Sequence, residues 1–507
     1  MSKIESLHIL IRTLSKAEKR HLSLQANLQC GNKVYMGLFS LFEKHDSPEE
    51  VYTRFIESFG KNSFEMAAKH LYRLIVETLL KLRKNQNVQT DIFNKITMSD
   101  ILFERELYDD ALTELSKAKR LASDFESDLL QQLIRRIELL YLSALDFKGV
   151  TERELIKKQL KINEIMKYTK NINMHMQLYD ILRHRLTHKG YARSDKQKED
   201  LNDLVLSELH LIANSSYKGF EANKLHLLFQ ATYYLNSGNY KLATRHYHDL
   251  LSLFDDNPHL LLNPPIYYLR AIHGVLDSLS IAGLYHEMSI FLMRLKNLEQ
   301  QDYPSEFILK VRSSFYLYES YRQLNTGAFD SAKELMIEYD NNLFKKINLM
   351  GLEDQLKLYL NATILYLCSH ELVIAKKYMR KIFYSGKLFH TLPSYKTARL
   401  VNLVLQAELG NYDFLENEIS AIKRNIRYEK QVYMTEKLIF RFVQDYPLPS
   451  YEKTRMKLWR KYRKEIEKIE NSKYERLLLK TFDFLSWIES KLTRFPFAEI
   501  LQQKVKF

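Results

Sequence analysis

The sequence predicts an all-α protein, an α-solenoid of stacked antiparallel helix pairs with a helical cap at each end. Two observations support this prediction. The 507 residues include only 13 Gly and 9 Pro, well below the average usage of about 7% and 5%, so the chain has few turn residues and reads as helices joined by short turns. In addition, the pattern Gly-x-aromatic-x-x-small recurs along the chain, and recurrence at a fixed period indicates a repeat architecture.

Each copy of the pattern predicts a turn between two helices. The glycine ends one helix in a left-handed conformation that needs no Cβ. The aromatic residue begins the next helix, and the small residue lies on the same face, where helix backbones approach closely. The clear copies are Gly238-Asn239-Tyr240 with Ala243, Gly283-Leu284-Tyr285 with Met288, and Gly327-Ala328-Phe329 with Ala332. The weaker copies are Leu107-Tyr108 with Ala111, Glu371-Leu372 with Ala375, and Gly410-Asn411-Tyr412 with Leu415.

The copy at Gly238 extends into both flanking helices and resembles a tetratricopeptide repeat. Apolar and small residues keep helical spacing before the turn at Leu227, Ala231 and Tyr234, and after it at Tyr240, Ala243, Tyr247 and Leu250. The anchors at 240, 285, 329, 372 and 412 lie 45, 44, 43 and 40 residues apart, whereas a standard tetratricopeptide repeat has about 34 residues. We therefore expect a divergent array with longer helices of about 17–20 residues. No copy is detectable in the two repeats needed near 150 and 195.

Residues 1–90 lie outside the pattern and are predicted to form an N-terminal helical domain. Ser15 and Glu18 are spaced as a capping box, and Ser47-Pro48 is a strong helix start. The last helix of this segment is expected from Phe64 to about Lys84. Its cations suggest a helix-turn-helix reader of DNA, or basic residues at the end of an ordinary capping helix. These cations are Lys69, Arg73, Lys81 and Arg83.

The array is predicted to occupy residues 91–447, with a charged interruption at 183–190 and a loop at 195–200. Pro447 and Pro449 end it, because a Pro-x-Pro stretch cannot continue a helix. Residues 448–507 form a C-terminal cap, whose first helix has an apolar stripe and an opposite basic stripe. The apolar stripe is Leu458, Tyr462, Ile466 and Ile469. The basic stripe is Lys457, Lys461, Lys464 and Lys468, flanked by Arg460. It is either the polar outer face of a cap or a ridge that binds phosphate or an acidic partner.

The composition favours a cytoplasmic binding protein, without a membrane span and without a cofactor or metal. The net charge of +14 is compatible with acidic partners or nucleic acid. Cys30 and Cys368 are expected to be reduced thiols. No phosphate-binding Gly loop or serine-nucleophile motif occurs, and His184 and His188, although four residues apart, are surrounded by cations that disfavour a metal. No residue is nominated for catalysis.

The resemblance implies a superhelix whose groove binds a peptide or a helix of another protein. The leading functional hypothesis is therefore a non-catalytic scaffold or adaptor for a protein or peptide partner. The alternative is a transcriptional regulator that contacts nucleic acid through residues 1–90 and senses a partner through the array. A third hypothesis, an enzyme with a dispersed site, has no residue to support it. The tail, with Phe495-Pro496-Phe497 and Ile500-Leu501, could fold back into the groove.

Overall fold

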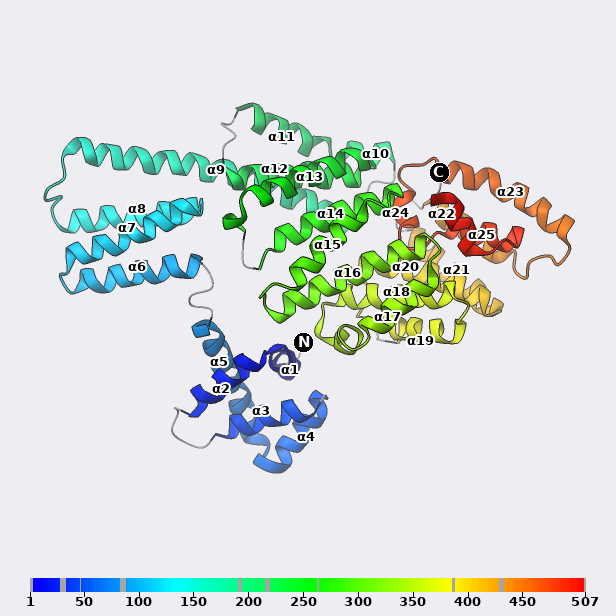
Figure 1. The fold of residues 1–507 in the computed structure, drawn as a ribbon, viewed down its shortest axis with the longest axis horizontal. Helices are drawn as coiled ribbons and strands as arrows, with labels where there is room; N and C mark the ends of the chain where they lie inside the picture. Colours follow the sequence, from blue (N-terminus) through cyan, green and yellow to red (C-terminus); the bar gives the residue numbers. More distant parts are fainter. Residues whose placement is uncertain are drawn as a thin grey trace. The chain divides into compact units, whose positions relative to one another are not determined.

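The computed structural model describes residues 3–27, 33–45, 47–82, 88–189, 194–214, 219–261, 264–384, 388–427 and 433–505. Within these ranges every regular element is helical, as Figure 1 shows. The chain forms two compact units, Met1–Asn171 with Tyr303–Phe307, and Ile172–Asp302 with Ile308–Phe507. The predicted boundaries at 90 and 447 concern a finer division into three segments and stay a prediction.

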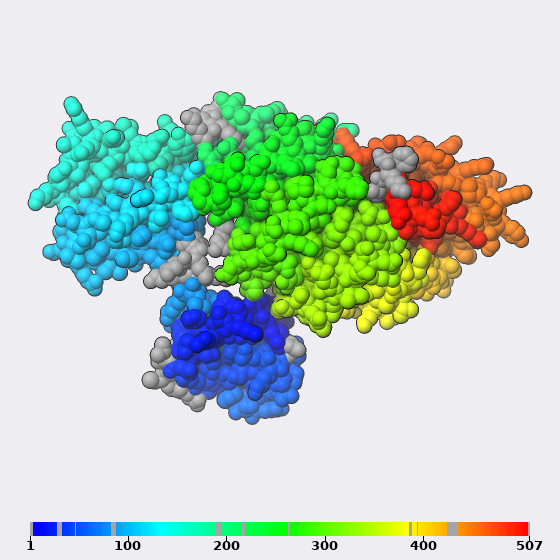
Figure 2. All heavy atoms as spheres, viewed as in Figure 1, coloured from blue at the N-terminus to red at the C-terminus, as the bar shows by residue number. Residues whose placement is uncertain are grey.

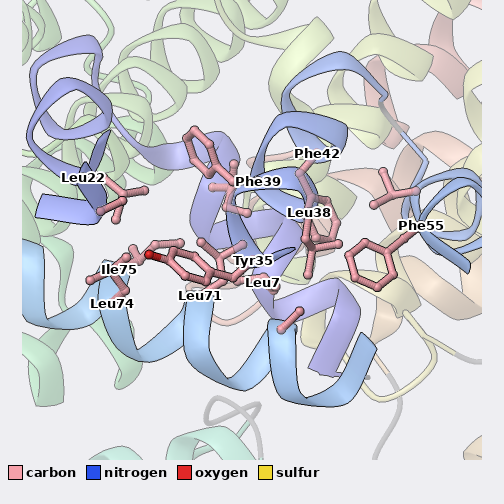
Figure 3. Close-up of a cluster of buried hydrophobic side chains, with 14 of the residues drawn as sticks. Leu7, Leu22, Tyr35, Leu38, Phe39, Phe42, Phe55, Leu71, Leu74 and Ile75 are labelled. Atoms are coloured by element: carbon pink, nitrogen blue, oxygen red, sulfur yellow. The ribbon is translucent and has the colours of Figure 1, made fainter. Parts of the chain in front are cut away.

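The first unit begins with five helices that share one hydrophobic core. They are α1 (Lys3–Thr13), α2 (Lys16–Asn27), α3 (Val34–Lys44), α4 (Pro48–Phe59) and α5 (Lys61–Leu82). Figure 3 shows their buried side chains meeting between the helices, among them Leu38, Phe42 and Phe55. The predicted helix starts are present: Ser15 and Glu18 form the reciprocal capping bonds, and the Ser47 hydroxyl accepts a bond from the Glu50 amide at the start of α4.

A second core in the same unit joins three further helices. They are α6 (Val88–Glu104), α7 (Tyr108–Asp124) and α8 (Asp128–Ala144). The long helix α9 (Glu152–Lys189) follows, and the boundary between the two units falls within it. This helix corrects the prediction that the repeat register continues near 150 and is interrupted at 183–190. Residues 152–189 contain neither Gly nor Pro, so nothing in the sequence breaks the helix into a pair.

The second unit contains the remaining helices, apart from residues 305–307, and many of the consecutive helices pack on one another, which is consistent with a helical repeat. They are α10 (Asp195–Glu199), α11 (Asn202–Asn214), α12 (Phe220–Asn236), α13 (Tyr240–Asp256), α14 (Ile266–Ala282), α15 (Met288–Glu299), α16 (Ser305–Asn325), α17 (Phe329–Tyr339), α18 (Leu352–Cys368), α19 (Leu372–Phe383), α20 (Pro393–Glu408), α21 (Tyr412–Arg427), α22 (Met434–Gln444), α23 (Glu452–Glu470), α24 (Arg476–Leu479), α25 (Phe484–Thr493) and α26 (Phe497–Val505). Short 3-10 helices occur at Pro258–Leu260 and Phe344–Leu349. The loop predicted at 195–200 is instead mostly α10, because the Ser194 hydroxyl caps it.

All six copies of the pattern lie at turns between two helices, and the six turns share one backbone geometry. The residue two positions before each anchor has a positive φ: 73–79° for the glycines at 238, 283, 327 and 410, 64° for Glu106 and 59° for His370. The next amide donates to the carbonyl five residues earlier, as from Asn239 to Tyr234 at 2.9 Å. This is the Schellman ending of a helix. The weaker copies therefore keep the turn without its glycine.

Helices α13 and α14 approach each other so closely at Gly274 that this position has no room for a side chain. A Cβ placed on Gly274 of α14 would lie 2.2 Å from Cζ of Tyr247 on α13. The aromatic anchor Tyr240 and the small residue Ala243 of the same helix are buried, as the pattern predicts. None of the described helices combines the length and the apolar character needed to cross a lipid bilayer.

Candidate functional site

The lysine face of α23 consists of the five cations predicted for this helix, Lys457, Arg460, Lys461, Lys464 and Lys468. All five residues are exposed, and Figure 2 shows α23, in orange, at the surface of the second unit. Within the described residues none of the five forms an ion pair with an acid. The one close contact is with an aromatic ring, where the Lys461 ammonium lies 5.9 Å from the centroid of Tyr462. The lysine face is therefore electrostatically uncompensated by its surroundings.

Three acidic residues on the same helix do not neutralise the lysine face, because other cations bind them. The pairs are Glu465 with Arg441, Glu467 with Arg463, and Glu470 with Lys504. The Arg463 pair is an ordinary contact of 3.0 Å four residues along the helix. The other two acids pair with side chains from α22 and α26. Each of these acids is therefore unavailable to neutralise a residue of the lysine face.

The opposite face of α23 is buried against α22 and α25. The predicted apolar stripe is largely correct, since Tyr462, Ile466 and Ile469 are buried, but Trp459 is buried in place of the half-buried Leu458. Below this stripe the buried guanidinium of Arg455 donates to the carbonyl of Leu492 at 2.9 Å. These contacts fix the orientation of the helix, so its lysine face must point outward.

The predicted cations of α5 lie in the first unit. Lys69, Arg73 and Lys81 are exposed, and Arg83 lies outside the described residues. Arg73 donates to Glu77 at 2.8 Å, and this bond and charge raise the pKa of the guanidinium and lower the pKa of the carboxyl. One of the three described cations of this helix is therefore neutralised locally.

The exposed surface of α5 is also more apolar than a charge-based DNA reader requires. Large apolar side chains are exposed on the same helix as its cations, and Met66 and Leu80 are 76% and 71% exposed. Tyr72 and Val76 belong to the same exposed set. The eight described cations of the predicted site thus fall into two groups in different units, and only the α23 group forms an uninterrupted basic face.

The C-terminal segment, residues 473–505 with α24, α25 and α26, lies against the turns of the repeated helix pairs. The hydroxyl of Tyr240, an anchor of the pattern, donates to the carbonyl of Lys473 at 2.7 Å. At the next contact the amide of Asn325 donates to the carbonyl of Lys480 at 3.3 Å. In both contacts a side chain beside a repeated turn binds the backbone of the segment.

Aromatic and charged side chains of the segment complete this contact. The Phe497 ring lies 5.9 Å from that of the anchor Phe329, and the indole of Trp487 donates to Glu408 at 2.7 Å. Lys491 pairs with the same carboxylate. Gly327 leaves room for the segment, because a Cβ there would lie 2.6 Å from the carbonyl oxygen of Ala498.

Of the tail residues expected to fold back, Phe497, Ile500 and Leu501 do pack against other helices, whereas Phe495 is exposed. The placement of Phe495 was not predictable, because it lies in the short break between α25 and α26. The tail therefore belongs to the packed structure of the second unit.

A buried polar cluster connects the segment to α14 and α16. Lys480 and the Tyr318 hydroxyl both donate to one oxygen of Asp277. Burial alone would raise the pKa of Asp277, but the charge and the hydrogen bonds of Lys480, with that of Tyr318, outweigh it and hold the pKa below its usual range. Nearby, His273 contacts the Ser314 hydroxyl at 2.7 Å, and burial lowers the pKa of this imidazole to about 4.

A basic hollow of about 770 Å³ lies between α8 and α9 in the first unit. Its cations are Arg135 from α8 and Lys157, Lys158 and Lys161 from α9. Sequence reasoning did not find it, because the two helices had not been predicted as neighbours. The only local signal was the cluster of lysines near the start of α9.

The structure reveals no catalytic or metal-binding cluster in its described part. The rings of His184 and His188 lie 4.3 Å apart and are exposed, but no group of three His, Cys, Asp or Glu there is placed to hold a metal ion. Cys368 is buried, and burial raises the pKa of its thiol. Cys30 lies outside the described residues.

Comparison of the chain with protein-family models, with curated proteins and with solved structures finds no match in any of the three.

Proposed function

We propose that the protein is a non-catalytic scaffold or adaptor, in which helix pairs like those of tetratricopeptide repeats form a superhelix and hold a peptide or helix of another protein in its groove. The observation that supports this proposal is the C-terminal segment, a helical stretch held across the turns at Tyr240, Phe329 and Glu408. Stacked helix pairs characteristically offer extended surfaces of this kind, and helical segments bind to such surfaces through regularly spaced anchors.

The contacts of the segment indicate what chemistry a bound partner would need. The indole of Trp487 and the ammonium of Lys480 each donate to an acid of the repeats. The phenyl ring of Phe497 contacts an aromatic anchor. Large aromatic groups and charge-assisted bonds dominate binding energy at protein interfaces. A partner with the same groups at matching spacing would either replace the segment or bind beside it.

The first experiment tests whether the repeats bind such a segment in trans. A protease site is inserted after the exposed Asn471 of the full-length protein, and the purified protein is cut there after folding. Fluorescent peptide 473–507 is then added, and exchange with the resident segment is followed by gel filtration. The control peptides carry Trp487→Ala or Phe497→Ala.

Exchange of the labelled peptide, reduced for both control peptides, is the expected result. If the cut segment leaves only when the whole protein unfolds, the segment is a fixed part of the core and this surface is not a binding site. A pull-down from native lysate with and without nuclease then distinguishes a protein partner from nucleic acid.

A second candidate function, a nucleic-acid-associated regulator, is favoured by the lysine face of α23. Unpaired lysines bind phosphates, and such binding weakens steeply as salt concentration rises. Replacement of Lys457, Lys461, Lys464 and Lys468 by Gln would abolish it, and the same changes should leave exchange of the C-terminal peptide unaltered. Absence of binding to labelled duplex DNA and to RNA at low salt would eliminate this candidate.

We place the scaffold in the cytoplasm. This part of the proposal is supported by Cys368, which is buried as a free thiol, because unpaired cysteines suit a reducing compartment. Fractionation of cells that express the tagged full-length protein tests it directly.

A further inference from the structure

The α8–α9 hollow combines an excess of positive charge with an exposed apolar side chain. Arg135, Lys157, Lys158 and Lys161 line it, together with Leu160 and with two acids discussed next. Leu160 is 62% exposed, which is unusual for a leucine on the wall of a hollow. The hollow lies entirely within the first unit, far in sequence from the C-terminal segment.

The two acids in the hollow are already bonded to residues of α9 or to the residue just before it. Glu154 accepts bonds from the amide and the hydroxyl of Thr151, both at 2.9 Å, and so caps the start of the helix. These bonds lower the pKa of Glu154, so it stays ionised and committed to the cap. Glu164 pairs with Lys161 at 2.7 Å.

A third acid, which is not part of the lining, pairs with another lysine of the hollow. Glu138 of α8 bridges Lys119 of α7 at 2.9 Å and Lys158 of α9 at 2.5 Å. Burial raises the pKa of Glu138, but the bonds and charges of the two lysines lower it more. This bridge ties three helices together and fixes the wall on which Lys158 stands.

Arg135 and Lys157 remain without an acidic partner among the described residues. Nε of Arg135 is shielded from solvent and has no hydrogen-bond acceptor there, which is costly for a donor that would otherwise bond to water. The two cations come from opposite walls of the hollow, Arg135 from α8 and Lys157 from α9. The hollow therefore offers two unpaired cations and one exposed leucine to a ligand.

We infer that the α8–α9 hollow binds an acidic, leucine-containing helical segment of a partner protein, which places carboxylates on Arg135 and Lys157 and an apolar side chain on Leu160. This site is separate from the surface of the second unit in the proposed function. Charge complementarity selects the occupant: Glu154, which keeps its negative charge, would repel a continuous phosphate backbone, whereas an acidic peptide can space its carboxylates to avoid it. An apolar side chain of a peptide can also pack on Leu160, which a phosphate backbone cannot do.

The experiment measures binding of a fluorescein-labelled peptide of repeated Glu-Leu-Leu-Glu units to the full-length protein by anisotropy. The test variants are Arg135→Gln with Lys157→Gln, and separately Leu160→Ala. The matched control is Arg153→Gln with Lys167→Gln, which removes the same charge from exposed positions of α9 outside the hollow. A second peptide has Gln in place of every Glu.

The expected result is saturable binding that the Arg135 and Lys157 variant weakens roughly tenfold, as two screened charge contacts would. Leu160→Ala should weaken binding as well, the control variant should change it little, and the Gln peptide should bind poorly. Photo-leucine in the peptide should cross-link to α9 near Leu160. The inference is overturned if the wild-type protein does not bind, if both charge variants weaken binding equally, or if the Gln peptide binds as well.

Discussion

Lys480 of the C-terminal segment donates to the carboxylate of Asp277 in α14, across 203 residues of sequence. This contact supplies the counter-charge for an acid whose surroundings disfavour ionisation. It also ties the segment to α14. Removal of the lysine would leave the carboxylate with the Tyr318 hydroxyl as its remaining donor among the described residues.

Replacement of Lys480 by Met is expected to lower the free energy of unfolding by about 1–3 kcal/mol, the usual cost of a charged group left without its partner. Urea unfolding of the full-length protein measures this. The double variant with Asp277→Asn should lose less than the sum of the two single variants. Lys464→Met on the lysine face serves as the control, with a change within about 0.5 kcal/mol; an equal loss there would contradict the role of the pair.

The shared turn geometry predicts opposite effects at glycine and non-glycine copies. Gly283→Ala should destabilise the protein by about 1 kcal/mol, because φ is 76° there and L side chains disfavour that region. No atom lies within 4 Å of the new Cβ, so a steric clash adds nothing to this cost. His370→Gly should stabilise it by up to about 1 kcal/mol, since φ there is 59°. Thermal melting of both variants tests the pair of signs. Stabilisation by Gly283→Ala would show that the turn is not held in the left-handed region.

Gly274→Ala is expected to destabilise by about 1–3 kcal/mol, because the new methyl overlaps the Tyr247 ring. The combination with Tyr247→Leu removes the overlapping atoms and should restore part of the loss. Urea unfolding of the two single variants and the double variant gives the coupling. Additive losses would mean that the two helices separate freely at this contact.

The burial of His273 predicts a loss of stability on acidification. Its pKa is about 4 in the folded protein and about 6.5 in an unfolded chain, so between these values the unfolded state binds more protons. Stability should therefore fall as the pH is lowered from about 6.5 to about 4, by at most about 1.4 kcal/mol per pH unit from this group. Below pH 4 this group adds no further loss.

The measurement is urea unfolding at a series of pH values, compared with His273→Asn. The groups that act on His273 are Asp277, which favours its charged form, and Lys310, Lys357 and Lys480, which oppose it. The variant should show a flatter profile in this window. An identical slope would mean that other buried histidines, such as His175 and His246, whose pKa values burial also lowers, account for the effect.

The helical class and the six turns could be predicted because their signals are local. A glycine, an aromatic residue and a small residue within six positions predict a Schellman turn, and the copies without glycine have the same turn. The left-handed conformations of Glu106 and His370 could not be predicted, because these residue types usually avoid that region. Helix α9 was mispredicted because a 44-residue period was extended through a stretch without any Gly or Pro.

The interaction surfaces were less predictable, because they join residues that are distant in sequence. The lysine face of α23 followed from helical spacing alone. Arg135 and Lys157 share a hollow only because α8 and α9 pack together, and no local pattern reports that packing. The contact of Tyr240 with Lys473 spans 233 residues, and the chemistry of neither residue specifies the other.

The long reach of the C-terminal segment has a consequence for biosynthesis. During translation the repeats are synthesised before the residues that contact Tyr240, Asp277 and Gly327. Contacts between residues distant in sequence form late in folding. The nascent chain must therefore persist with an unmatched carboxylate and uncovered aromatic anchors until residues 473–505 have been synthesised. A premature stop codon near residue 470 would leave this state permanently, and the shortened product would be a substrate for chaperones and proteases.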